Sequence, residues 1–127
     1  MKQRSLYLAI SLSMFAGMGL IGCEVSKATT GGSTDLPPQV QSARVLIRDI
    51  YPEASYFRVK MNYTRDDERV LAWTNDSDWI YLSSKWVAWA DKDITYAGCV
   101  LVHEWYHVQG YDELNAERKE SECKQLI

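Results

Sequence analysis

The sequence has no hydrophobic run long enough to cross a bilayer, no excess of basic residues and only two histidines. Its longest apolar stretch, residues 6–21, covers about 16 residues, whereas a transmembrane helix needs about 20. The absence of such a run argues against a spanning anchor. The 17 acidic residues outnumber the 14 basic ones, which argues against a nucleic-acid partner.

The N-terminus has the features of a secretion signal. Lys2 and Arg4 form a short basic region, the apolar stretch follows, and Gly22 precedes Cys23. This order resembles the lipobox of bacterial lipoproteins, which implies a signal peptide at 1–22 and acyl chains such as palmitate on Cys23. We therefore expect the protein in the bacterial cell envelope, lipid-anchored to a membrane on its periplasmic or outer-membrane side.

The rest of the chain divides into a linker and one small domain. Residues 23–38 are rich in Thr, Gly and Ser and lack apolar periodicity, so we expect a lipidated flexible tether. Residues 39–127 are then long enough for a single domain. Loss of residues 1–22 removes two basic residues and no acidic ones, which changes the net charge from −3 to −5.

Hydrophobic periodicity predicts helices at both ends of this domain and strands between them. Apolar residues at helical spacing predict a first helix, which Pro52 closes: Val40, Ala43, Leu46, Ile47 and Ile50. Strands are expected at 57–64, 70–74 and 79–83, and a last helix at about 112–125. The order predicts an α+β fold with a small antiparallel sheet and two C-terminal helices in an antiparallel hairpin.

The segment with the clearest chemistry is HExxH at residues 103–107. His103 and His107 stand four apart, so on a helix both side chains project from one face and can bind one metal ion. Glu104 lies beside them, where it can serve as general base toward a metal-bound water. The motif therefore predicts a divalent metal site.

The flanking residues predict that this motif lies on an amphipathic helix. Apolar residues lead into and through it at helical spacing: Ile94, Ala97, Leu101, Trp105 and Val108. Asp91 or Asp93 suits the start of the helix, and Gly110 suits its end. A solvated surface helix is the alternative, but the apolar lead-in favours a half-buried helix whose histidines need partners.

The segment resembles the active-site helix of the zincin metallopeptidases and the metzincin pattern HExxHxxGxxH. Glu113 stands where that pattern has its third histidine, and no methionine follows to form a Met-turn. The resemblance implies a minimal zincin-like domain in which His103, His107 and Glu113 hold Zn²⁺ and Glu104 is catalytic. It also implies hydrolysis of a peptide or protein substrate. The spacing is similar to HGxxHxxGYDH of bacterial rRNA-maturation endoribonucleases, but the envelope location argues against RNA.

The C-terminal hairpin predicts a disulfide. Cys99 and Cys123 lie equally far before and after a turn near Tyr111, so antiparallel helices would place them face to face. They would remain after lipidation in a compartment where disulfides persist. The alternative is that Cys99, one turn before His103, is a soft zinc ligand.

Three carboxylates on the last helix compete for the position of third ligand. Glu113, Glu117 and Glu120 recur at helical spacing and face the histidines across the hairpin. Glu113 has the metzincin-like spacing and is our choice. Glu117 lies opposite the histidines by hairpin geometry. Glu120 resembles the glutamate of the ExxA pattern on the second helix of gluzincins, although residues 113–116 fit that pattern more closely.

Two functions follow from this pattern. The first is a membrane-anchored zinc metallopeptidase-like lipoprotein, and the second is a non-catalytic lipoprotein that keeps the zincin-like fold and binds a partner. Glu104 argues against the second, because a purely structural zinc site has no use for a general base. In an enzyme, residues 79–83 would be either an edge strand that pairs with substrate or another core strand.

Overall fold

The computed structural model describes residues 33–63, 70–75 and 79–127 of the chain. The predicted signal peptide and Cys23 lie outside these residues. Within the predicted tether, Ser33 forms two backbone hydrogen bonds of 2.8 Å with Met61. In the three described segments, none of the helices combines the length and apolar character that a bilayer crossing requires.

The described residues form five helices and a three-stranded sheet, which confirms the α+β class. The elements are α1 (Pro38–Ile47), α2 (Pro52–Tyr56), β1 (Val59–Met61), β2 (Ala72–Asn75), β3 (Trp79–Leu82), α3 (Ser84–Lys92), α4 (Ile94–Val108) and α5 (Glu113–Leu126). Periodicity predicted all of them except α2 and α3. Pro52 not only closes the first helical segment but also occupies the first turn of α2, where its missing N–H costs nothing.

The sheet is mixed, so the prediction of a fully antiparallel sheet is wrong. Its central strand β3 pairs parallel with β1 and antiparallel with β2. Because β3 is central, the alternative that residues 79–83 form a substrate-binding edge strand is also wrong. Alternation of apolar and polar residues reveals which face of a strand is buried, but not the direction of its neighbours.

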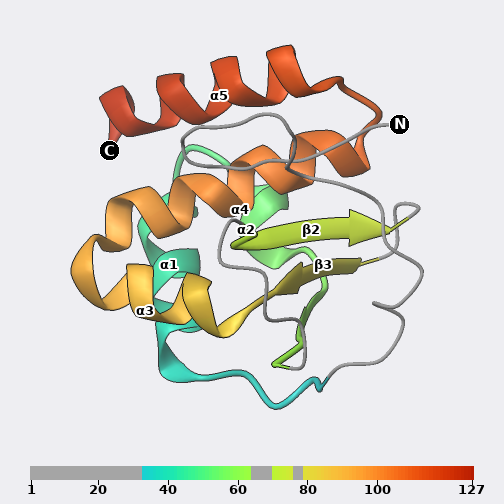
Figure 1. The fold of residues 1–127 in the computed structure, drawn as a ribbon. Helices are drawn as coiled ribbons and strands as arrows, with labels where there is room; N and C mark the ends of the chain where they lie inside the picture. Colours follow the sequence, from blue (N-terminus) through green and yellow to red (C-terminus); the bar gives the residue numbers. More distant parts are fainter. Residues whose placement is uncertain (1–32, 64–69, 76–78) are drawn as a thin grey trace.

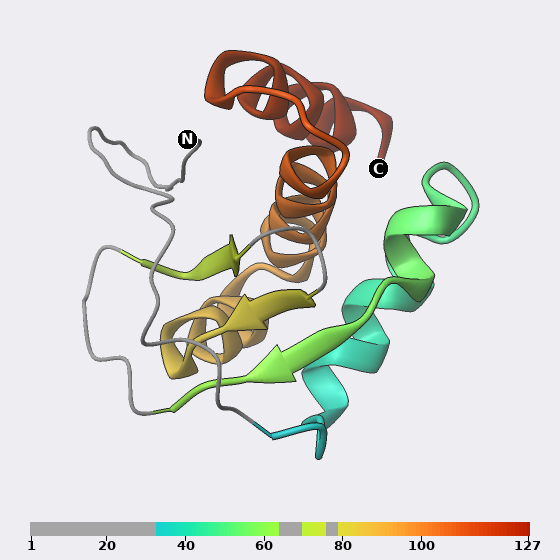
Figure 2. The same cartoon turned by 90° about the vertical axis from the view of Figure 1, so that its right-hand side faces the viewer.

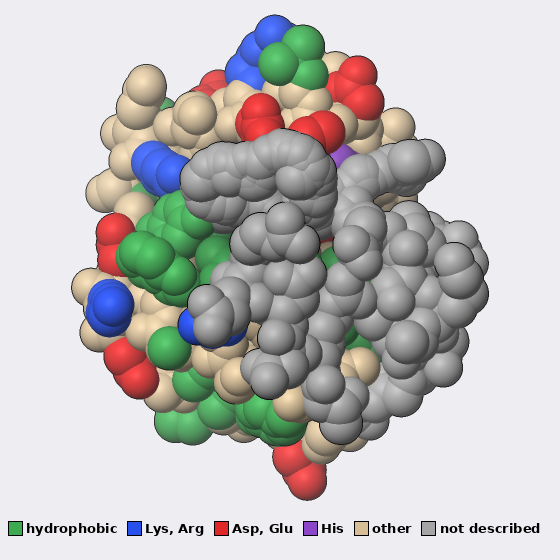
Figure 3. Space-filling view, viewed as in Figure 1, with side chains coloured by type: hydrophobic (Ala, Val, Ile, Leu, Met, Phe, Trp, Pro, Cys, Tyr) green, Lys and Arg blue, Asp and Glu red, His purple; other side chains and the backbone are tan. Residues whose placement is uncertain are grey.

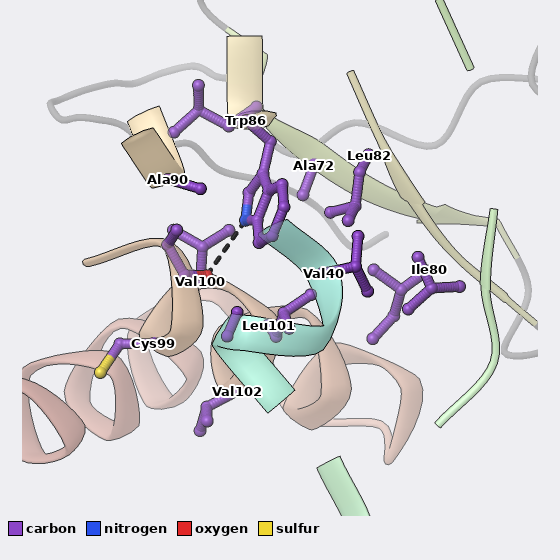
Figure 4. Packing of buried hydrophobic residues seen from close by; sticks show 14 of the residues in the cluster. Val40, Ala72, Ile80, Leu82, Trp86, Ala90, Cys99, Val100, Leu101 and Val102 are labelled. Carbon is purple, nitrogen blue, oxygen red and sulfur yellow. Dashed lines mark hydrogen bonds between the residues drawn. The ribbon is translucent and has the colours of Figure 1, made fainter. Parts of the chain in front are cut away.

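Helix α4 lies between α5 and the sheet in both ribbon views (Figures 1 and 2). It contacts α1, α2, α3, α5, β2 and β3, so it is the element around which the core is built. Nine of its residues are buried, which explains its apolar composition. Figure 4 shows Trp86 of α3 against this helix, where its indole N–H donates to the Ala97 carbonyl at 3.0 Å.

A glycine lets α1 approach α4 closely. At Gly98, an added Cβ would lie 3.1 Å from Ile47 Cγ2 and 3.5 Å from the Ala43 carbonyl oxygen of α1. These distances leave no room for a larger side chain without displacement of α1. The close approach helps to set the position of α4, and therefore of His103 and His107, which follow Gly98 on the same helix.

Candidate metal centre

The α4–α5 hairpin carries the predicted site, and polar caps define its ends. Asp93 begins α4 by accepting a hydrogen bond from the Tyr96 N–H at 3.0 Å. Gly110 has φ of +99°, a conformation that glycine adopts easily, and it reverses the chain after α4. Asp112 then caps α5 by accepting from the Asn115 N–H at 2.9 Å.

The predicted disulfide closes the hairpin at its open end. Cys99 of α4 and Cys123 of α5 are bonded, with Cα atoms 5.7 Å apart, and both are fully buried. This bond confirms the disulfide prediction. It also makes the alternative of Cys99 as a metal ligand wrong, because a sulfur in a disulfide is no longer a thiolate.

The two histidines and Glu113 converge on one point. Glu113 Oε1 lies 2.7 Å from His107 Nε2 and 3.3 Å from His103 Nε2, and the two ring centroids are 4.9 Å apart. The three ligand atoms lie within 4.8 Å of one another. In a tetrahedral zinc site with bonds of about 2.0–2.1 Å, neighbouring ligand atoms stand about 3.3–3.4 Å apart. These residues therefore fit a divalent metal ion with small adjustments.

The outer nitrogen of each ring also has a partner. His103 Nδ1 lies 2.8 Å from Glu120 Oε1, and His107 Nδ1 lies 3.0 Å from the backbone carbonyl oxygen of Tyr111. Both partners only accept hydrogen bonds, so each places a proton on Nδ1. In the neutral ring, this leaves the lone pair on Nε2, which is the form that binds a metal.

Glu104 lies beside the proposed ligands rather than among them. Its side chain is 2% exposed, and its Oε2 is 3.9 Å from His103 Nε2. Its carboxylate therefore lies on the Nε2 side of the His103 ring, beside the candidate metal site. This is the position that the HExxH pattern predicted for a general base.

Of the three carboxylates considered for the third ligand, one contacts both Nε2 atoms. Glu113 does so, Glu120 reaches only the outer nitrogen of His103, and Glu117 is exposed. Partial desolvation and a hydrogen bond with Glu113 raise the pKa of Glu117 to about 7. Glu117 therefore neighbours Glu113, but it is not among the three residues whose ligand atoms converge.

Without a metal, the cluster favours a proton on His103. Burial alone would lower the pKa of His103, but Glu113 and Glu120 overcome this effect and raise it to about 10. Burial would likewise raise the pKa of Glu113, but the histidines hold it well below its usual range. The negative charge around the rings stabilises a proton in the same way that it would stabilise a metal cation.

Sequence reasoning did not identify the contacts to the outer ring nitrogens. The partner of His107 is a backbone carbonyl, which no side-chain pattern can reveal. One sequence signal pointed to Glu120, its place two helical turns after Glu113. That spacing predicted a metal ligand, not an outer partner of a histidine. The candidate metal site lies near the surface, since the Glu113 side chain is 34% exposed and Figure 3 shows part of a histidine beside acidic side chains.

Comparison of the chain with protein-family models, with curated proteins and with solved structures found no match. The resemblance to zincin metallopeptidases therefore remains a prediction, and the arrangement of His103, His107 and Glu113 is the observation on which the functional assignment depends.

Proposed function

We propose that the protein is a zinc-dependent metallopeptidase-like lipoprotein that hydrolyses peptide bonds at a membrane surface. The observation that supports this proposal is the convergence of two Nε2 atoms and one Glu113 oxygen, with the buried Glu104 alongside. Two histidines and a carboxylate form a donor set of catalytic zinc sites, which keep a fourth position open. A structural zinc site would be closed by a fourth protein ligand.

Each residue then has a defined task. His103, His107 and Glu113 would hold the ion, which when bound supplies a Lewis acid that acidifies water and polarises a peptide carbonyl. Glu104 would accept the proton of the attacking water on its carboxylate and return it to the leaving amine. Its burial favours this task, because the low-polarity surroundings strengthen its interaction with nearby charge.

The proposed location has support of a different kind. The N-terminal pattern before Cys23 is that of a lipoprotein signal, and acylation of Cys23 would hold the domain at the envelope membrane. The disulfide between Cys99 and Cys123 agrees with an oxidising compartment outside the cytosol.

The test is to measure zinc content and hydrolysis of a general protein substrate, with the purified full-length protein and its Glu104→Gln variant. We expect about one zinc per chain in both proteins and a fall in turnover of about 10²-fold or more in the variant. The Glu122→Gln variant is the matched control, because it changes an exposed carboxylate of the same helix that pairs with Lys119. Wild-type protein without zinc would exclude the proposal, and zinc without turnover would favour the partner-binding alternative.

A further inference from the structure

We propose that Glu120 is a positioning residue that acts on the metal through His103, an inference that rests on the proposed zinc centre. Glu120 Oε1 lies 2.8 Å from His103 Nδ1, whereas Glu113 approaches the same ring at Nε2. Both partners are buried, with His103 1% and Glu120 7% exposed. Glu120 thus holds the ring from the side opposite the ion.

This contact determines which nitrogen can bind the metal. A carboxylate has no proton to donate, so the bond with Glu120 requires the hydrogen of His103 on Nδ1 and leaves Nε2 as the donor atom. The negative charge also makes the imidazole a stronger ligand. Without Glu120, the Nε2–H tautomer could donate its proton to Glu113, and this tautomer cannot bind the ion.

The two rings are supported unequally. His107 has the neutral carbonyl of Tyr111 as its outer partner, whereas His103 has a charged carboxylate. His103 is also the ring whose Nε2 lies 3.9 Å from Glu104 Oε2. Glu120 therefore places its charge behind the ligand that stands next to the proposed general base.

Glu120 is itself held in place. Lys124 Nζ lies 2.9 Å from its second oxygen, Oε2, and Cys123 anchors the same helix one turn away. A buried carboxylate carries a desolvation cost, and an apolar side chain would stabilise a position of purely structural importance at least as well. The charge at position 120 is better explained by its action on His103.

The main test is the zinc affinity of Glu120→Ala and Glu120→Gln, measured at pH 7 by competition with a fluorescent chelator. We expect a loss of about 10–100-fold for Glu120→Ala. Glu120→Gln should lose less, because its amide oxygen can still accept from Nδ1–H without supplying the charge. Glu122→Ala is the matched control, since Glu122 is exposed on the same helix and pairs only with Lys119 in the described contacts. Its affinity should equal that of the wild type.

A second readout separates positioning from simple stabilisation. ¹⁵N NMR of the imidazoles should show His103 with its proton on Nδ1 in the zinc-loaded wild type and in Glu122→Ala. In folded, zinc-free Glu120→Ala with a neutral ring, the His103 proton should move from Nδ1 to Nε2, because Glu113 is then its carboxylate partner. A purely structural role would lower the melting temperature and leave the proton on Nδ1 in the folded variant.

The possible failures are distinguishable. If the wild type binds zinc and folded Glu120→Ala binds it as tightly as Glu122→Ala does, only this inference is overturned. If the wild type binds no zinc, the proposed function falls together with it. Should Glu120→Ala not fold by circular dichroism, the isosteric Glu120→Gln decides. Failure of both to fold would assign Glu120 to folding and overturn the positioning role.

Discussion

Cys99 and Cys123 join α4 to α5 about one helical turn from two residues of the candidate metal centre, His103 on α4 and Glu120 on α5. The bond matters because α5 buries little apolar surface. Its buried residues are Ala116, Glu120 and Cys123, of which one is charged and one is the disulfide cysteine itself. The helix that carries Glu113 therefore depends on the disulfide and on the histidine–glutamate contacts for its position.

The first prediction concerns this dependence. The Cys99→Ala/Cys123→Ala double variant should lose about 3 kcal/mol of unfolding free energy, the value that chain entropy gives for a loop of this size. Its zinc affinity should also fall, because α5 no longer holds Glu113 against the histidines. Urea denaturation and chelator competition measure the two effects. Unchanged zinc affinity in the double variant would show that the hairpin holds its geometry without the bond.

The second prediction separates the third ligand from its neighbours. His107→Ala and Glu113→Ala should each lose more zinc affinity than the roughly 10–100-fold expected for an outer partner, because each removes an atom bound to the ion. Glu117→Ala should lose less zinc affinity than Glu113→Ala does, since Glu117 is exposed and its hydrogen bond is to Glu113. Equilibrium dialysis followed by metal analysis gives the comparison. A larger loss in Glu117→Ala than in Glu113→Ala would reverse the assignment.

The third prediction concerns the contact between α1 and α4. Gly98→Leu should destabilise the protein by about 1–3 kcal/mol, because even its first carbon meets Ile47 at 3.1 Å. Ala88→Leu is the control, since Ala88 is exposed on α3. The midpoint of urea unfolding in the presence of a chelator measures the effect. Equal midpoints for the two variants would mean that α1 moves away without cost.

The fourth prediction is the pH dependence of the metal-free protein. The pKa of Glu117 is raised from 4.5 to about 7, and that of His103 from 6.5 to about 10. In each group the folded state binds its proton more tightly than the unfolded state does. The stability that each contributes is complete below the ordinary pKa and is lost as pH rises through the folded pKa.

In the presence of EDTA, the stability that Glu117 and His103 contribute should therefore fall as pH rises between about 4.5 and 10. The difference in melting temperature between the wild type and each variant isolates this contribution. His103→Gln should lose the part of this slope above pH 6.5, and Glu117→Gln the part below pH 7. Zinc should oppose the decline, because it replaces the proton on His103. If the melting temperature changed with pH equally in the wild type and both variants, His103 and Glu117 would not be the source of the pH dependence.

The local sequence determined the helices of the hairpin and their covalent link. Apolar spacing in α4, a positive φ at Gly110 and the equal distances of Cys99 and Cys123 from the turn are properties of short segments. Such features depend on backbone geometry and nearby side chains, so they can be read along the chain. The placement of His103, Glu104 and His107 on one helix is likewise a local feature that can be read along the chain.

Only the tertiary structure decided which strands pair and which carboxylate does what. The parallel pairing of β1 with β3 depends on where the chain crosses the sheet, not on the alternation within either strand. The choice among Glu113, Glu117 and Glu120 depends on the rotation of α5 about its own axis. Packing against α4 and the disulfide set that rotation, so that Glu113 faces both Nε2 atoms and Glu120 lies behind His103.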